Sequence, residues 1–288
     1  MTNILAKTIS YCLALALPLA FVYPKAQAAT KPGASKAPTI SKAPGAPTPA
    51  ILADNSLGGV DSPYTPQLNA LIEKSRAATP SPALVSTSGP AKEDIVLECL
   101  GLKDNKYYIG ARQEMVIHAS AKAIAAIMDD IDHYKELFPG YKDIHVENRD
   151  GDKVISYWEQ EMPIPFVDNV TYEMIYKFAW LNDTEKLYRY QLKAKTNLIA
   201  SDGFIYLKEL PNHDTLYIEY DFYDAQWGAA KSLGLRKIWY DSVEGMALSD
   251  LATKVKAEHP DLSNERAKKD GKKLVKSDTI VKCILPVL

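Results

Sequence analysis

Six strand-like segments follow one another between residues 142 and 226, with no helical pattern between them. Each is rich in β-branched and aromatic residues, and turn sequences such as DGD at 150–152 and PNHD at 211–214 separate them. Strands in direct succession indicate an antiparallel sheet. A seventh strand is expected at 110–120. The apolar periodicity of 229–259, ended by Pro260, predicts a long helix that covers one face of this sheet.

Two short helices are expected between the first strand and the other six, at 121–131 and 132–138. Ser120 is a suitable N-cap for the first, and Pro139-Gly140 ends the second. The acidic residues of this stretch alternate with apolar ones, as on a solvated surface. Their spacing does not supply the converging oxygens and glycine turn of a calcium loop. We therefore interpret the stretch as structural and expect no metal site.

The first 28 residues have the layout of a secretory signal peptide. Lys7 precedes an apolar run from Ile9 to Val22, and Ala26-Gln27-Ala28 is a small-x-small cleavage site. We expect cleavage near Ala28 and export to a periplasm or the outside, with an uncleaved anchor as the alternative. Without Lys7 and Lys25, 32 of the 34 basic residues remain against 36 acidic ones, a net charge of −4. This charge argues against nucleic-acid binding.

The exported chain divides by composition into three parts. Residues 29–92 are dominated by Ala, Pro, Ser and Thr and are expected to form a disordered linker. Within it, 66–76 has the pattern of a short helix, which we interpret as transient, with docking on the domain or on a partner as the alternative. Residues 93–260 form one folded domain, and 261–288 form a basic and then apolar tail. The linker and the tail are candidate contacts for an envelope protein, or for a membrane in transient contact.

Two cysteines remain after cleavage, Cys99 and Cys283. In an oxidising compartment they can pair, which would close a loop around nearly the whole domain. The sequence leaves this pairing open against two separate buried thiols.

The order of elements resembles the START-like, helix-grip family, also called the Bet v 1-like or polyketide cyclase superfamily. The stretch VIHASAKAIAAIMDDIDHYKELFPGYKDIHV is similar to the family's start, and MPIPFVDNVTYEM to the turn of START lipid-transfer domains, with Pro163, Pro165 and Val170 in matching places. The family's Arg is missing, and Asp168-Asn169 stand near its place. The resemblance covers about residues 105–260. It implies an α+β fold with a seven-stranded curved antiparallel sheet wrapped on a long C-terminal helix.

The resemblance also implies a cavity between the sheet and the long helix. Because side chains alternate along a strand, each strand offers one inward set. A plainly filled core is the alternative, since any such sandwich would show these stripes. The side chains that we expect to contact a ligand are Trp158, Tyr172, Met174, Tyr176, Phe204, Tyr206, Tyr220, Phe222, Trp239, Ser242 and Met246.

A cavity lined by Tyr, Trp and Met suits a lipid, a sterol or another hydrophobic small molecule with few polar groups. We therefore interpret the chain as a carrier or sensor of such a ligand, with no cofactor and no catalytic residue assigned. A cyclase or hydratase acting on a hydrophobic substrate is one alternative. An envelope adaptor without a ligand is the other. The five histidines are scattered, and among them only His118 was expected to face inward.

Overall fold

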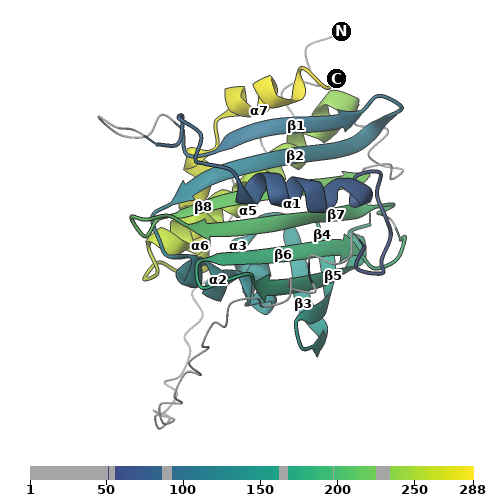
Figure 1. Ribbon diagram of the computed structural model, residues 1–288. Helices are drawn as coiled ribbons and strands as arrows, with labels where there is room; N and C mark the ends of the chain where they lie inside the picture. Colours follow the sequence, from purple (N-terminus) through teal and green to yellow (C-terminus); the bar gives the residue numbers. More distant parts are fainter. Residues whose placement is uncertain (1–50, 52–55, 86–92, 162–167, 197, 225–233) are drawn as a thin grey trace, which may run out of the picture. The chain divides into compact units, whose positions relative to one another are not determined.

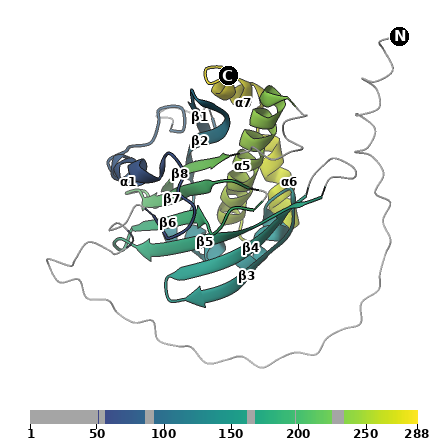
Figure 2. The same ribbon diagram turned by 90° about the vertical axis from the view of Figure 1, so that its right-hand side faces the viewer.

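The computed structural model describes residues 51, 56–85, 93–161, 168–196, 198–224 and 234–288. The expected signal peptide, residues 1–28, and the proline turn at 162–167 lie outside the described residues. The described part is α+β, with one sheet and helices on both of its faces (Figures 1 and 2). None of the described helices is long and apolar enough to cross a membrane.

The expected antiparallel sheet and long helix are confirmed, but the sheet has eight strands in the described residues, not seven. Its spatial order is β1-β2-β8-β7-β6-β5-β4-β3, and every neighbouring pair is antiparallel. The strand that the sequence reading missed is β1. Its alternation is weak, and it pairs with only one neighbour, β2. The strands are β1 (Val96–Leu102), β2 (Asn105–Ile117), β3 (Tyr141–Asp150), β4 (Lys153–Gln160), β5 (Val170–Trp180), β6 (Glu185–Leu192), β7 (Ser201–Glu209) and β8 (Thr215–Asp224).

The two short helices stand where they were expected, now after the second strand. Ser120 caps α2 (Ala121–Met128), since its hydroxyl accepts a hydrogen bond from the Ala123 amide at 3.3 Å. The second is a 3₁₀ turn, η3 (Ile131–His133), that continues into α3 (Tyr134–Leu137). The long helix is α5 (Leu235–Glu258), which packs against β2 and α2.

The sheet is buried on both faces. On the face that we call the inner face, Ala247 and Leu251 of α5 pack against Tyr188, Leu207 and Tyr217. On the opposite face, the outer face, the 3₁₀ turn η2 (Thr65–Gln67) is followed by α1 (Leu68–Arg76), which lies along β7. Figures 1 and 2 show α1 and α5 on opposite sides of the sheet.

The docked α1 corrects the expectation of a disordered linker over this part of 29–92. Leu68 and Ile72 are fully buried among residues of β6, β7 and β8. The contact is extended by Val60, whose amide donates to the Leu192 carbonyl at 2.7 Å. The sequence reading undervalued this short apolar stripe because its surroundings are rich in Pro and Ala. Most of residues 29–55, and residues 86–92, lie outside the described residues.

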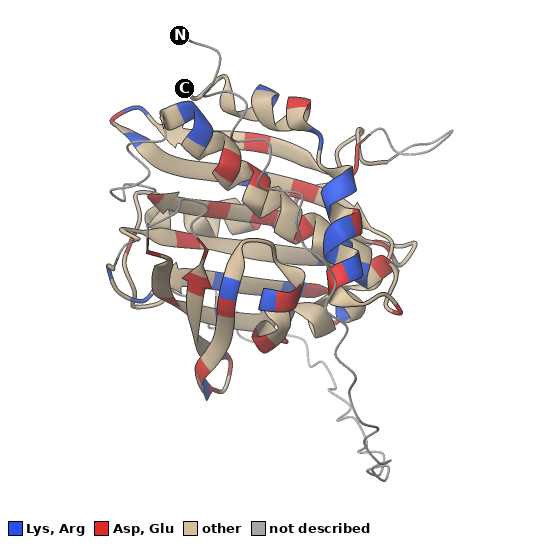
Figure 3. Cartoon of the chain, turned by 180° about the vertical axis from the view of Figure 1, so that it is seen from behind, with Lys and Arg blue, Asp and Glu red and all other residues tan. Residues whose placement is uncertain are grey.

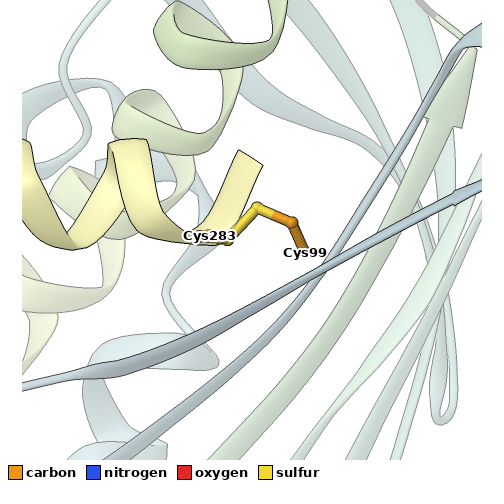
Figure 4. Close-up of a disulfide and its surroundings, with 2 residues drawn as sticks. All are labelled: Cys99 and Cys283. Atoms are coloured by element: carbon orange, nitrogen blue, oxygen red, sulfur yellow. A yellow bond between two sulfur atoms is a disulfide. The ribbon is translucent and has the colours of Figure 1, made fainter. Parts of the chain in front are cut away.

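The C-terminal segment is also docked on the domain. It forms α6 (Asn264–Leu274), which packs along α5 and carries the lysines that stand out in Figure 3, and then α7 (Ser277–Ile284). Ile280 and Ile284 of α7 are fully buried against Ile109 and Trp239. Cys283 forms a disulfide with Cys99 of β1, with a Cα–Cα distance of 5.0 Å (Figure 4). The pairing that the sequence left open is therefore present.

We predict that α1 contributes to the stability of the domain. Ile72→Ala removes a fully buried side chain and is expected to lower the free energy of unfolding by about 3 kcal/mol. Urea unfolding followed by circular dichroism measures this. The matched control is Lys74→Ala, on the exposed side of the same helix. Equal stability of the two variants would show that α1 does not dock.

We also predict that the disulfide stabilises the domain by about 4 kcal/mol, because it closes a loop of 184 residues in the unfolded chain. Thiol reductant should lower the melting temperature of the wild-type protein. In Cys283→Ser the melting temperature should already be lower and should no longer respond to reductant. A wild-type protein that melts identically with and without reductant would contradict this.

Candidate ligand-binding site

The structure places the expected site residues of β4 and β5 together on the inner face. Trp158 stacks with Tyr172 and Tyr176, each with its ring centroid 6.2 Å away. Met174 belongs to the same buried cluster. Two aromatic residues that the sequence reading did not select complete the group. Tyr141 meets the Trp158 ring edge-on at 5.1 Å, and Tyr190 lies 5.7 Å from Tyr176.

The four expected residues of β7 and β8 lie on the other face of the sheet, which corrects the prediction for them. Phe204, Tyr206, Tyr220 and Phe222 form the outer-face cluster together with Leu68 and Ile72 of α1. The inner face of β8 carries the alternate set instead: Tyr217, Glu219, Asp221 and Tyr223.

The sequence favours these four residues as the inward set because the set contains no carboxylates. Nothing in the sequence indicates that α1 covers them. A one-residue error of this kind moves every side chain of a strand to the opposite face.

The expected residues of α5 are divided between two places. Trp239 is buried beside the disulfide, where its indole nitrogen donates to the Lys106 carbonyl at 3.1 Å. Ser242 is half-buried and lies near the Tyr223 hydroxyl, where it offsets part of the rise that burial causes in the pKa of Tyr223, so it faces the inner-face residues of β8. Met246 is half-buried and packs near Trp239.

Four inner-face tyrosines have raised pKa values although their side chains keep some solvent exposure. Burial raises the pKa of Tyr141 to about 12, and it raises the pKa of Tyr172, Tyr176 and Tyr223 well above the usual value. Each of the four is nevertheless only half-buried. These four side chains come from β3, β5 and β8 and pack against the same buried cluster on the inner face of the sheet.

Three carboxyl groups lie at the inner face near these tyrosines. Glu219 and Asp221 come from β8 and Asp250 from α5. The Tyr190 hydroxyl donates to Glu219 Oε1 at 2.9 Å, and the Tyr217 hydroxyl donates to Asp250 Oδ1 at 2.7 Å. We call the three carboxyls of Glu219, Asp221 and Asp250, together with Gln113 of β2, the acidic cluster. Gln113 Nε2 lies 3.3 Å from Glu219 Oε2 and donates to it.

The acidic cluster holds protons more tightly than exposed carboxyls do. Burial and the neighbouring Asp250 raise the pKa of Glu219 well above its usual range, and burial raises the pKa of Asp250 to about 7. Burial and Glu219 likewise raise the pKa of Asp221. In the described part of the chain, no Lys or Arg forms an ion pair with any of the three. Because the three carboxyls lie close to one another and have no counter-cation, their neutral forms are favoured.

Three other polar side chains of the strands and their ends lie away from the inner face. His118 is exposed and pairs with Asp214 at 3.0 Å, so the expectation that it faces inward is wrong. Arg112 pairs with Glu114 at 2.5 Å. Arg189 is buried on the outer face, where it donates to the Ile51 carbonyl at 3.4 Å. Among the described residues, no group of His, Cys, Asp and Glu is arranged to hold a metal ion.

Comparison with solved structures finds likenesses at low sequence identity. A STAR-related lipid transfer protein fragment from Xanthomonas axonopodis is 14% identical over 62% of this chain and 94% of that one, with a TM-score of 0.42. Human STARD10 is 11% identical over 75% and 91%, with a TM-score of 0.46. The Zhui aromatase/cyclase from Streptomyces sp. R1128 is 9% identical over 59% and 98%, with a TM-score of 0.41. No family model and no curated protein matches the chain.

We predict that the acidic cluster makes the fold less stable as the pH rises. The folded chain keeps protons on Glu219 and Asp250 that the unfolded chain loses above about pH 4. The free energy of unfolding should therefore fall between about pH 4 and pH 7, by up to about 1.4 kcal/mol per pH unit for one proton. Urea midpoints across this range should fall less steeply in Asp250→Asn than in the wild type. Parallel slopes would contradict the raised pKa values.

Proposed function

We propose that this protein binds a hydrophobic small molecule or lipid in the space between the inner face of the sheet and α5. The observation that carries the proposal is the aromatic wall around Trp158, where half-buried tyrosines from three strands pack beside one another on the inner face. Aromatic rings offer large apolar contact area, and their hydroxyls offer a few polar contacts. Such a wall with a small polar region at one side is the usual composition of a ligand pocket.

An entrance at the beginning of α5 fits this arrangement. An open depression of about 720 Å³ lies there, lined by Gly234, Leu235, Arg236, Lys237, Tyr240 and Asp241. Ser242, which faces the inner-face tyrosines, follows directly along the helix. A ligand that enters beside the first turns of α5 would therefore meet Ser242 and Tyr223 first.

Carriage or sensing of the ligand outside the cytoplasm is the role that we propose. The layout of residues 1–28 supports export, and the disulfide between Cys99 and Cys283 is a bond that persists in oxidising compartments. Transient contact with a membrane, or with an envelope protein, remains a prediction. Leu285 and Leu288, which are exposed at the end of the docked tail, are the residues that would make it.

A catalytic role is the second candidate, and the acidic cluster is the observation that favours it. Two adjacent carboxyls with raised pKa values beside a pocket form a common acid/base arrangement. A cyclase or hydratase would change its ligand, whereas a carrier would release it unchanged. Mass spectrometry of the ligand before and after incubation separates the two.

The direct test of binding is native mass spectrometry, with lipid extraction, on the mature protein purified from its own compartment. We expect a bound hydrophobic molecule in a one-to-one ratio. An empty protein that also gains no thermal stability from a panel of lipids and aromatic compounds would contradict the proposal. The ligand-free adaptor would then be the better interpretation.

The position of the ligand can be tested with one blocking substitution. Ser242→Phe places a ring beside Tyr223 and should lower the affinity for the ligand at least about fivefold, because overfilling a packed interior costs more than about 1 kcal/mol. The control is Ser277→Phe, which makes the same substitution at an exposed position of α7. Equal ligand occupancy in the two variants would place the ligand elsewhere.

A further inference from the structure

Two of the three carboxyls in the acidic cluster share a hydrogen bond. It joins Glu219 and Asp250 and needs a proton on one of them. The Gln113 amide and the Tyr190 and Tyr217 hydroxyls also donate to the cluster. Among the described residues, no other group donates to Asp250 Oδ2 or Gln113 Oε1, and these side chains have exposed fractions of only 5% and 0%. A cation that displaces the shared proton must therefore bring donors of its own, because a buried acceptor without a donor is costly.

The cluster borders the internal space that the proposed function assigns to the ligand. Asp221 is half-buried, as are the inner-face tyrosines around it, so part of it faces that space. The Tyr190 hydroxyl bonds Glu219 at 2.9 Å, while its ring lies 5.7 Å from that of Tyr176. The acceptors and the aromatic wall are therefore parts of one site.

We propose that this site recognises the primary ammonium group of an amphipathic amine, with Glu219, Asp221 and Asp250 facing the head group and the Trp158 wall facing the apolar body. This inference rests on the proposed function and names its class of ligand. A protonated primary amine brings three N–H donors and one positive charge, so it can replace the shared proton and also donate to Asp250 and Gln113.

Other head groups fit this site less well. A fatty acid would bring a further carboxylate beside three carboxyls. A quaternary ammonium carries the charge and suits the aromatic rings, but it has no N–H group to give to Asp250 or Gln113. An alcohol brings one donor and no charge. The primary amine is therefore expected to bind more tightly than all three.

Binding of an ammonium group should release protons from the cluster. The titratable groups that face the carboxyls are Tyr134 of α3, Tyr141 of β3, Tyr172 and Tyr176 of β5, Tyr190 of β6, and Tyr217 and Tyr223 of β8. Burial raises the pKa of all seven, so they stay neutral near pH 7. The protons that the arriving cation displaces must therefore come from the three carboxyls, and they pass to the buffer.

The test is a binding series on the full mature protein with four probes that share one chain length. These are dodecylamine, dodecyltrimethylammonium, dodecanol and dodecanoate, each kept below its micelle concentration. We expect dodecylamine to bind at least about tenfold more tightly than each of the others, the ratio that one charge-assisted hydrogen bond provides. Calorimetry of the wild-type protein in two buffers of different ionisation heat should show proton release with dodecylamine and none with dodecanol.

Glu219→Gln should reduce the ratio of dodecylamine to dodecanol affinity toward one. Glu147→Gln, which makes the same change at an exposed position, should leave the ratio unchanged. Equal affinities for dodecylamine and dodecanol in the wild-type protein, or binding of dodecylamine without proton release, would overturn the inference and leave the proposed function standing. If none of the four probes binds, the proposed function fails and this inference fails with it.

Discussion

Burial of the sheet on both faces is the constraint on which the rest of the structure depends. The inner face packs on α5 and the outer face on the segment that contains α1. Because both faces are covered, β6 has almost no exposed residue. The sequence of β6 therefore does not show which of its side chains face α5. The docked α1 therefore decides which residues of β7 and β8 form an ordinary core and which remain available to a ligand.

The carboxyls of the inner face are difficult to explain by folding alone. Burying ionisable groups without a counter-cation costs free energy, and apolar residues of similar volume would stabilise the same core better. The outer face also buries ionisable groups, Arg189 and Asp202, but there the guanidinium offsets part of the effect of burial on the pKa of Asp202. Among the described residues the inner-face carboxyls have no ion pair with a Lys or Arg, and this difference is the common basis of both proposals.

The sequence allowed the strands, the two short helices and the long helix to be predicted, because each depends on local periodicity and turn residues. The alternation along β4 and β5 predicts that Trp158, Tyr172, Met174 and Tyr176 share one face of the sheet, and they do so, while their contact with a ligand stays a prediction. The same reasoning failed for Phe204, Tyr206, Tyr220 and Phe222, because the face of a strand depends on what covers it, and α1 lies more than 120 residues earlier in the chain. The acidic cluster was missed for a related reason. Glu219 and Asp221 look like solvent-facing residues until Asp250 of α5 is placed beside them.

The bond between Cys99 and Cys283 joins the first strand of the sheet to the last helix of the chain. The described loops that connect β2 to α7 all lie within the covalent ring that this bond closes. A single protease cut in any of them would leave one covalently connected molecule of unchanged mass apart from an added water. Such clipping would escape notice on a non-reducing gel and would appear as two fragments only after reduction. Samples of this protein therefore need both gels before they are judged intact.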